Sequence, residues 1–146
     1  MLHFEGEQDF ALVPADVWSR LSDARFLVEC VPGIEKVLKA EPGSAAWTLR
    51  PGLSFMRGTL HVTLRILEAV PATSLRLGLH SKGIGSTSTV EAALVFQAVG
   101  DGTHIDWSAD INELGGLLKA VPRGLIQASA QKVIADVWAQ IVAHLQ

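Results

Sequence analysis

Three histidines and several carboxylates are the side chains best suited to acid–base chemistry in this chain, and they share one pattern. Each lies in a run that alternates polar and apolar residues, as His61 does between Leu60 and Val62. Successive side chains of a strand point to opposite faces of the sheet. We therefore expect one outward-facing set: His61, His80, His104, Glu91, Asp106 and Asp110. Acid–base catalysis needs a titratable group within reach of the substrate, and the predicted interior contains none, so we assign no catalytic residue.

The remaining reactive or ligating residues also favour structural roles. Cys30 is the only cysteine and lies among Val28, Val31 and Pro32, which predicts a buried thiol and not a nucleophile. Residues 83–85 form a lone Gly-x-Gly between two expected strands, a context typical of a hairpin and not of a phosphate loop. No His-x-x-x-His spacing or Cys/His cluster is present. We predict no metal and no cofactor.

Four polar groups fall on the inward phase of the expected strands. Ser86 and Ser88 continue the phase of Val90 toward the start of their strand, and Trp47 and Trp107 carry indole N–H donors. These groups either offer hydrogen bonds at the mouth of a pocket or, in the case of the serines, bond to the backbone of the turn at 82–85. The sequence leaves both interpretations open.

The elements that position these residues follow from hydrophobic periodicity. A first strand ends before Pro14, two short helices occupy 16–21 and about 23–30, and the Pro32-Gly33 pair stops the second helix. Period-two runs then predict strands at 34–40, 45–50, 58–67, 75–80, 90–97 and 105–111. A long closing helix follows the breaks at 115–116 and 122–124. This order predicts an α+β fold with one antiparallel sheet of seven strands.

The inward phase of the sheet is almost wholly apolar. It comprises Trp47, Leu49, Leu60, Val62, Leu64, Leu75, Leu77, Leu79, Val90, Leu94, Phe96, Ile105, Trp107 and Ile111. The closing helix is expected to lay one stripe on this face, made of Ile126, Ala130, Val133, Val137, Ile141 and Leu145. Such a face either lines a cavity or packs into an ordinary filled core.

Composition restricts the class of protein. The chain has 146 residues, of which 49% are hydrophobic, and we expect one domain over residues 1–146. A net charge of −3 gives no basic footprint for nucleic acid. The single cysteine predicts a reducing, cytoplasmic setting, and the acidic amino terminus does not look like a signal peptide. The apolar runs are too short for a membrane span, which leaves peripheral membrane contact open.

Several motifs resemble one known family, the carbon monoxide dehydrogenase CoxG family of the START/Bet v 1-like SRPBCC superfamily. They are Phe4-x-Gly6, Pro14-x-x-Val17-Trp18-x-x-Leu21-x-Asp23, Cys30-Val31-Pro32-Gly33-Ile34-Glu35, Gly58, Asp101-Gly102-Thr103 and Gly115-Gly116. The resemblance implies a helix-grip fold, in which seven strands wrap around the carboxy-terminal helix. It also implies a hydrophobic ligand between sheet and helix, an oxidoreductase partner of the molybdenum CO dehydrogenase type, and a role in membrane recruitment or quinone transport. Some members carry a membrane-attachment extension, but this sequence ends at Gln146, so we expect no anchor of its own.

Together these observations predict a non-enzymatic protein that binds a lipid-like or quinone-like molecule in an internal cavity. The expected contacts are Trp47, Phe55, Leu60, Val62, Leu77, Leu79, Ser88, Trp107, Leu118 and Ile126. Two alternatives remain. A one-residue slip of register would turn His61, His80 or Glu91 inward and favour a cyclase- or hydrolase-type enzyme. A filled interior with an exposed apolar patch near Phe26, Leu27 and Val31 would favour an assembly or membrane-recruitment factor that acts through its surface.

Overall fold

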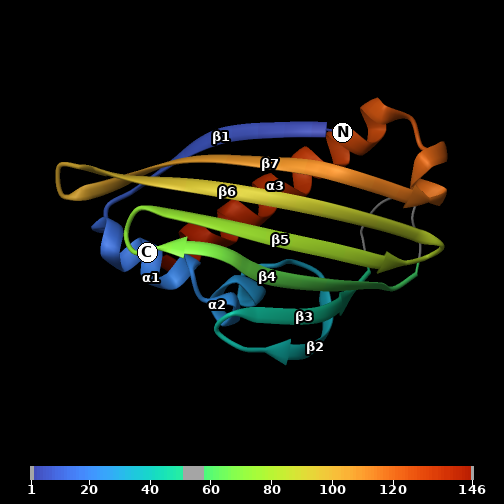
Figure 1. The fold of residues 1–146 in the computed structure, drawn as a ribbon, viewed down its shortest axis with the longest axis horizontal. Helices are drawn as coiled ribbons and strands as arrows, with labels where there is room; N and C mark the ends of the chain where they lie inside the picture. Colours follow the sequence, from blue (N-terminus) through green and yellow to red (C-terminus); the bar gives the residue numbers. More distant parts are fainter. Residues whose placement is uncertain (1, 51–57, 146) are drawn as a thin grey trace.

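One curved antiparallel sheet forms most of the molecule (Figure 1). The structure is a computed structural model that describes residues 2–50 and 58–145. Within these residues the sheet has seven strands in the order β1-β7-β6-β5-β4-β3-β2. The strands are β1 (Leu2–Phe10), β2 (Ile34–Ala40), β3 (Ser44–Leu49), β4 (Leu60–Val70), β5 (Ser74–Gly83), β6 (Ser86–Val99) and β7 (Gly102–Gly116). Each expected strand is present, and β5, β6 and β7 extend beyond the predicted bounds at both ends.

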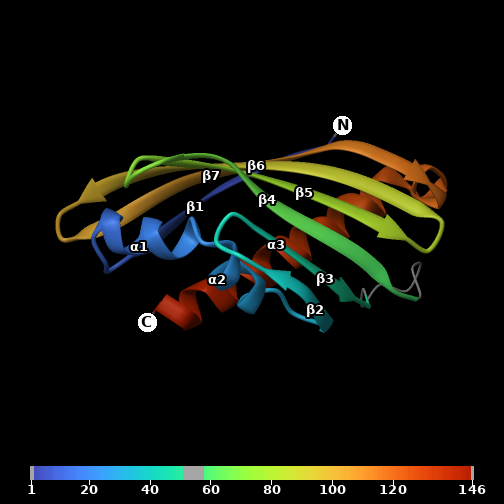
Figure 2. The same ribbon diagram turned by 60° about the horizontal axis from the view of Figure 1, so that its bottom comes forward.

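The helices lie on the concave side of this sheet (Figure 2). They are α1 (Pro14–Leu21), α2 (Ala24–Glu29), the short 3₁₀ helix η1 (Leu117–Ala120) and α3 (Arg123–Leu145). In Figure 1 α3 passes behind the strands, and in Figure 2 α1 and α2 lie beneath one end of the sheet. This is the expected helix-grip arrangement. Among the described residues, no helix combines the length and the hydropathy that crossing a membrane requires.

Local sequence signals explain where the two short helices begin and end. Pro14 opens α1, where its fixed φ suits the first helical turn. The Asp23 carboxylate caps α2 by accepting a hydrogen bond from the backbone N–H of Arg25 at 2.9 Å. The same carboxylate pairs with the Arg25 guanidinium, which lowers the pKa of Asp23. After α2 the chain turns at Gly33, whose φ of +76° favours glycine.

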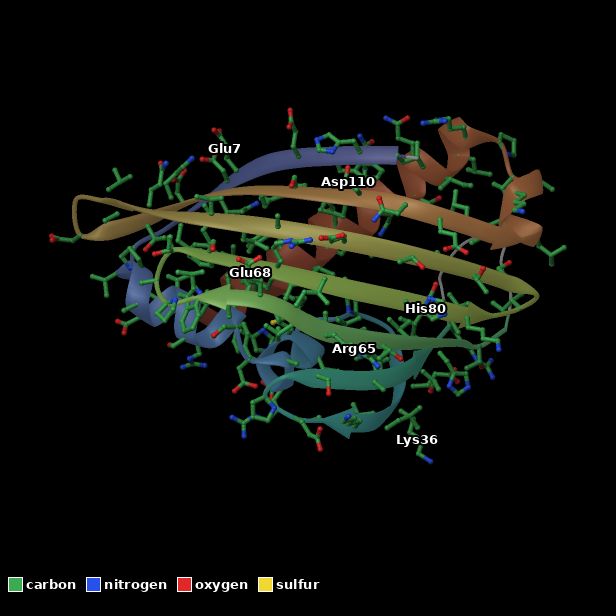
Figure 3. All side chains as sticks on the ribbon, in the orientation of Figure 1. Glu7, Lys36, Arg65, Glu68, His80 and Asp110 are labelled. Atoms are coloured by element: carbon green, nitrogen blue, oxygen red, sulfur yellow. The ribbon has the colours of Figure 1, made fainter. Side chains whose placement is uncertain are left out.

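The strand register puts every titratable strand residue singled out above on the outer face. Val62 of β4 pairs with Trp47 of β3 and Ser81 of β5, and the three share the concave face. His61 and Thr63, one position to either side of Val62, are exposed. Figure 3 shows charged and polar side chains across the opposite, outer face, including the labelled His80, Arg65 and Asp110. The predicted register of the sheet is therefore correct.

The closing helix packs with the expected stripe, which the structure widens by Ile134 and Trp138. Ile126, Trp138 and Ile141 are buried and Ala130, Ile134, Val137 and Leu145 are half-buried against the core, whereas Val133 is 49% exposed. The expected stripe followed aliphatic residues and omitted Trp138, whose ring lies 6.1 Å from that of Trp107 and 6.5 Å from that of Phe10. Trp138 joins the inward face because a large aromatic side chain buries much apolar area.

Candidate ligand-binding site

A cavity of about 440 Å³ lies between the concave face of the sheet and α3. Its walls come from strands β1 and β3–β7 and from α1, α2, η1 and α3. Among the described lining residues no side chain is titratable, and the polar ones are limited to Ser88, Ser108, Ser129 and the indoles of three tryptophans. The volume falls in the range of small-molecule sites in proteins. The inward face of the sheet therefore lines a cavity and does not pack into an ordinary filled core.

The sequence-based contacts are brought together at this cavity. Nine of the ten line it: Trp47, Leu60, Val62, Leu77, Leu79, Ser88, Trp107, Leu118 and Ile126. The tenth, Phe55, lies outside the described residues. The lining also contains residues that periodicity in the strands could not supply, since they lie on or beside the helices that close the ends: Leu21, Leu27, Val31, Ile134, Val137, Trp138 and Ile141.

The two inward serines have different partners. The Ser86 hydroxyl donates a hydrogen bond to the backbone carbonyl of Ile84 at 3.4 Å, so it belongs to the β5–β6 turn. Ser88 instead lines the cavity and shares a short hydrogen bond with Ser81 across the β5–β6 pair. Ser86 therefore bonds to the backbone of the turn, and Ser88 offers its hydroxyl at the pocket.

Trp107 separates this cavity from a second hollow. A more open groove of about 660 Å³ runs between β1 and α3, and it shares Phe4, Trp107, Ile134 and Trp138 with the cavity. The Trp107 indole lies directly over Gly6, where an added Cβ would come within 2.6 Å of the ring. Gly6 thus permits the position of this aromatic wall, and any larger residue would displace it.

The sequence matches the model of the CoxG family over residues 6–146, and this family takes its description from a component of carbon monoxide dehydrogenase. The match covers nearly the whole chain. The chain belongs to the CoxG family. No curated protein sequence matches it.

Several solved structures share the fold of this CoxG-family protein. A conserved protein from Geobacillus kaustophilus superposes with a TM-score of 0.85 at 19% identity, covering 99% of this chain and 95% of its own. A START superfamily protein from Mycobacterium smegmatis gives 0.69 at 10% identity, covering 98% and 96%. TTHA0849 from Thermus thermophilus gives 0.66 at 15% identity, covering 99% and 97%. At such identities the likeness establishes the START-like fold alone.

The groups required by the two alternative functions lie elsewhere in the CoxG-family chain. His61 and His80 are exposed on the outer face, and Glu91 is ion-paired there with Arg76. Phe26 and Leu27 are buried, at 7% and 8% exposure, so the expected exposed patch around them is absent from the described surface. Both side chains pack into the core because α2 turns its apolar side toward the sheet. The sign that would have favoured a surface-acting factor is therefore not found at Phe26 and Leu27.

Cys30 is fully buried at the end of α2. Burial, with a smaller contribution from the neighbouring Glu29 carboxylate, raises the pKa of its thiol to about 11. A thiol with this pKa is protonated at neutral pH, which makes it a poor nucleophile. In this CoxG-family protein the thiol contributes packing, as the sequence predicted.

A row of histidines and carboxylates occupies the outer face of β1 and β7. The His104 ring bonds to Asp9 at 2.7 Å and to Asp106 at 3.2 Å, and the His3 ring bonds to Asp110 at 2.5 Å. The hydrogen bond to Asp9 is the main cause that raises the pKa of His104, and the one to Asp110 does the same for His3. Glu7, His104 and Asp106 also bring three potential metal ligands within 4.8 Å of one another. Ion pairing accounts for their positions, so we assign no metal there.

The raised pKa of His104 predicts a pH dependence of stability. Below the unfolded pKa of about 6.5 the ion pairs contribute fully, and their contribution is lost as the pH rises through the higher folded pKa. We expect the unfolding free energy, measured by urea titration, to fall with rising pH across this window. His104→Gln and Asp9→Asn should both flatten that fall. If Asp9→Asn leaves the pH profile unchanged, the assignment to this pair is wrong.

Proposed function

We propose that this CoxG-family protein binds a hydrophobic, lipid-like or quinone-like molecule in the cavity between its sheet and α3. The observation that carries the proposal is the cavity of about 440 Å³, whose described lining is apolar apart from a few serines and indoles. Burying apolar ligand surface there supplies about 25 cal/mol per Å². Part of this is offset by the lost freedom of the ligand, so close filling of the cavity decides affinity.

The composition of the same lining favours ligand binding over acid–base catalysis. His61, His80 and Glu91 would be the acids or bases of an enzyme, and they lie on the other face of the sheet. The family's description further supports a partner oxidoreductase of the CO dehydrogenase type, to which this protein would bring its ligand. The proposed setting is the cytoplasm, an assignment that rests on the single cysteine.

The test is mass spectrometry of an organic extract of the purified protein. We expect a lipid or quinone to co-purify with the wild type in close to stoichiometric amount. A variant with arginine at Val62, inside the cavity, serves as the control and should carry none. Equal amounts of the same molecule on both proteins would show that it is bound outside the cavity and would contradict the proposal.

A further inference from the structure

Two polar side chains of the cavity lining, those of Trp47 and Ser88, fall in one row of the sheet near the β5–β6 turn. The strand register aligns Trp47 of β3 with Val62 of β4, Val62 with Ser81 of β5, and Ser81 with Ser88 of β6. The next two rows along the strands contain only apolar side chains: Ala45, Leu64, Leu79, Val90 and Ile111, then Ile66, Leu77, Ala92 and Ala109. Trp47 and Ser88 therefore form a polar end of this hydrophobic wall, and Ser81 lies beside it, bonded to Ser88.

Two hydrogen-bond donors in this row are left to serve a ligand. Trp47 is 2% exposed and lines the cavity, and its indole N–H is buried without a hydrogen-bond partner among the described residues. The Ser81 and Ser88 hydroxyls bond to each other, which uses one of their two protons. A buried donor without a partner destabilises the protein. A ligand that supplies an acceptor atom would remove this penalty on binding.

We propose that Trp47 and Ser88, the latter bonded to Ser81, bind the carbonyl-type oxygen of an uncharged lipid. The inference rests on the proposed function and names the class of ligand. The apolar rows hold the hydrocarbon part of the molecule, and the Trp47 indole N–H and the serine pair donate hydrogen bonds to its oxygen.

The residues around this row favour a ligand without charge. A carboxylate buried in this cavity would need a cationic partner. Among the described lining residues there is no lysine, arginine or histidine. A neutral ketone, ester or quinone carbonyl needs donors only, and donors are what the row offers. Fatty acid anions should therefore be poor ligands.

The second unpartnered indole lies too far along the sheet to belong to the same site. Trp107 is aligned with Leu94 of β6, six residues from Ser88, which corresponds to about 20 Å along the strand. Its N–H lies against Gly6 of β1. The Trp107 indole N–H therefore lies outside the polar row, although its ring lines the same cavity.

The experiment compares ligands that differ in one polar atom. The probes are 2-nonanone, decane and nonanoate, and each is titrated to displace the neutral fluorescent probe N-phenyl-1-naphthylamine from the whole chain. The measured quantity is the ratio of the affinities for 2-nonanone and decane. Decane has the same number of non-hydrogen atoms as 2-nonanone but no oxygen, so its affinity measures the apolar contacts alone. The ratio of the two affinities therefore isolates the contribution of the oxygen. We expect the wild type to bind both neutral probes and to bind nonanoate far more weakly at a pH where it is ionised.

The variants remove single donors and keep the packing nearly intact. Trp47→Phe and Ser88→Ala should each lower the ratio by roughly 2- to 12-fold, the range expected for one hydrogen bond. Trp18→Phe is the control and should leave the ratio unchanged, because its indole N–H donates to the Ser74 carbonyl at 3.0 Å outside the cavity.

The outcomes separate this inference from the proposed function. If neither neutral probe binds the wild type, the proposed function itself fails. If both bind but the ratio is the same in the wild type, Trp47→Phe and Ser88→Ala, the cavity is a ligand site and the polar row is not its acceptor site. A lower ratio in Trp18→Phe alone, or tight binding of nonanoate, would also overturn the inference.

Discussion

Arginine in place of Val62 is expected to abolish binding of an apolar probe. Val62 is 8% exposed and lines the cavity from the middle of the sheet. A guanidinium there would lie among apolar side chains with no acid among the described lining residues to pair with it. Such a charge either draws water into the cavity or turns away and distorts β4. The loss of stability should be about 3 kcal/mol, the scale of an unpaired buried charge.

The matched control is one residue away. Thr63→Arg adds the same side chain to the same strand, but on the exposed outer face. It should bind the probe like the wild type and change stability by less than about 0.5 kcal/mol. Probe fluorescence measures binding, and circular dichroism checks that each variant is folded.

A second cavity variant protects the test against simple unfolding. Leu79 lines the same cavity but is only half-buried, so Leu79→Arg has a shorter path to water and should remain folded. Leu79→Arg should nevertheless fail to bind the probe. Wild-type binding by a folded Leu79→Arg protein would rule out the cavity as the binding site.

Much of the fold and of the site could be predicted because the strands alternate cleanly. The alternation around Val62 and Leu79 fixes which face of the sheet is buried, and a slip by one residue would have exposed every apolar side chain of the strand. The nine described contacts predicted from the sequence line one cavity for this reason. A single strand pattern carries this information without any knowledge of its neighbours.

The helical side of the site could be predicted only in part. Ile126, Val137 and Ile141 of the expected stripe line the cavity. Trp138 was not expected there, and its ring contacts that of Trp107 with centroids 6.1 Å apart. Such a contact joins residues far apart in the sequence, so no local pattern reports it.

The existence of a cavity was also beyond the sequence. An apolar face looks the same whether the opposite helix packs close to it or stands away from it. Here the rings of Trp107 and Trp138, with centroids 6.1 Å apart, act as a spacer between the sheet and α3. The empty volume beside them depends on this separation, which only the assembled structure contains.

Filling the cavity should weaken binding strongly without destabilising the protein. Ala92 lies on β6 in the centre of the concave face and lines the cavity. Ala92→Phe would place a ring in space that is otherwise available to the ligand. We expect affinity for the apolar probe to fall at least about tenfold, because the probe loses part of its buried apolar surface. The new ring gains that burial itself, so the melting temperature should stay the same or rise.

Lower probe affinity together with an unchanged or higher melting temperature distinguishes a ligand cavity from a tightly packed core. In a filled core the added ring would be overpacked and would cost about 1–3 kcal/mol. Ala93→Phe is the matched control, since its side chain points to the outer face beside Arg76. It should leave probe binding unchanged. A marked drop in melting temperature for Ala92→Phe, with no drop for Ala93→Phe, would mean that the interior has no room for a ligand, since the two variants differ in the face that receives the ring.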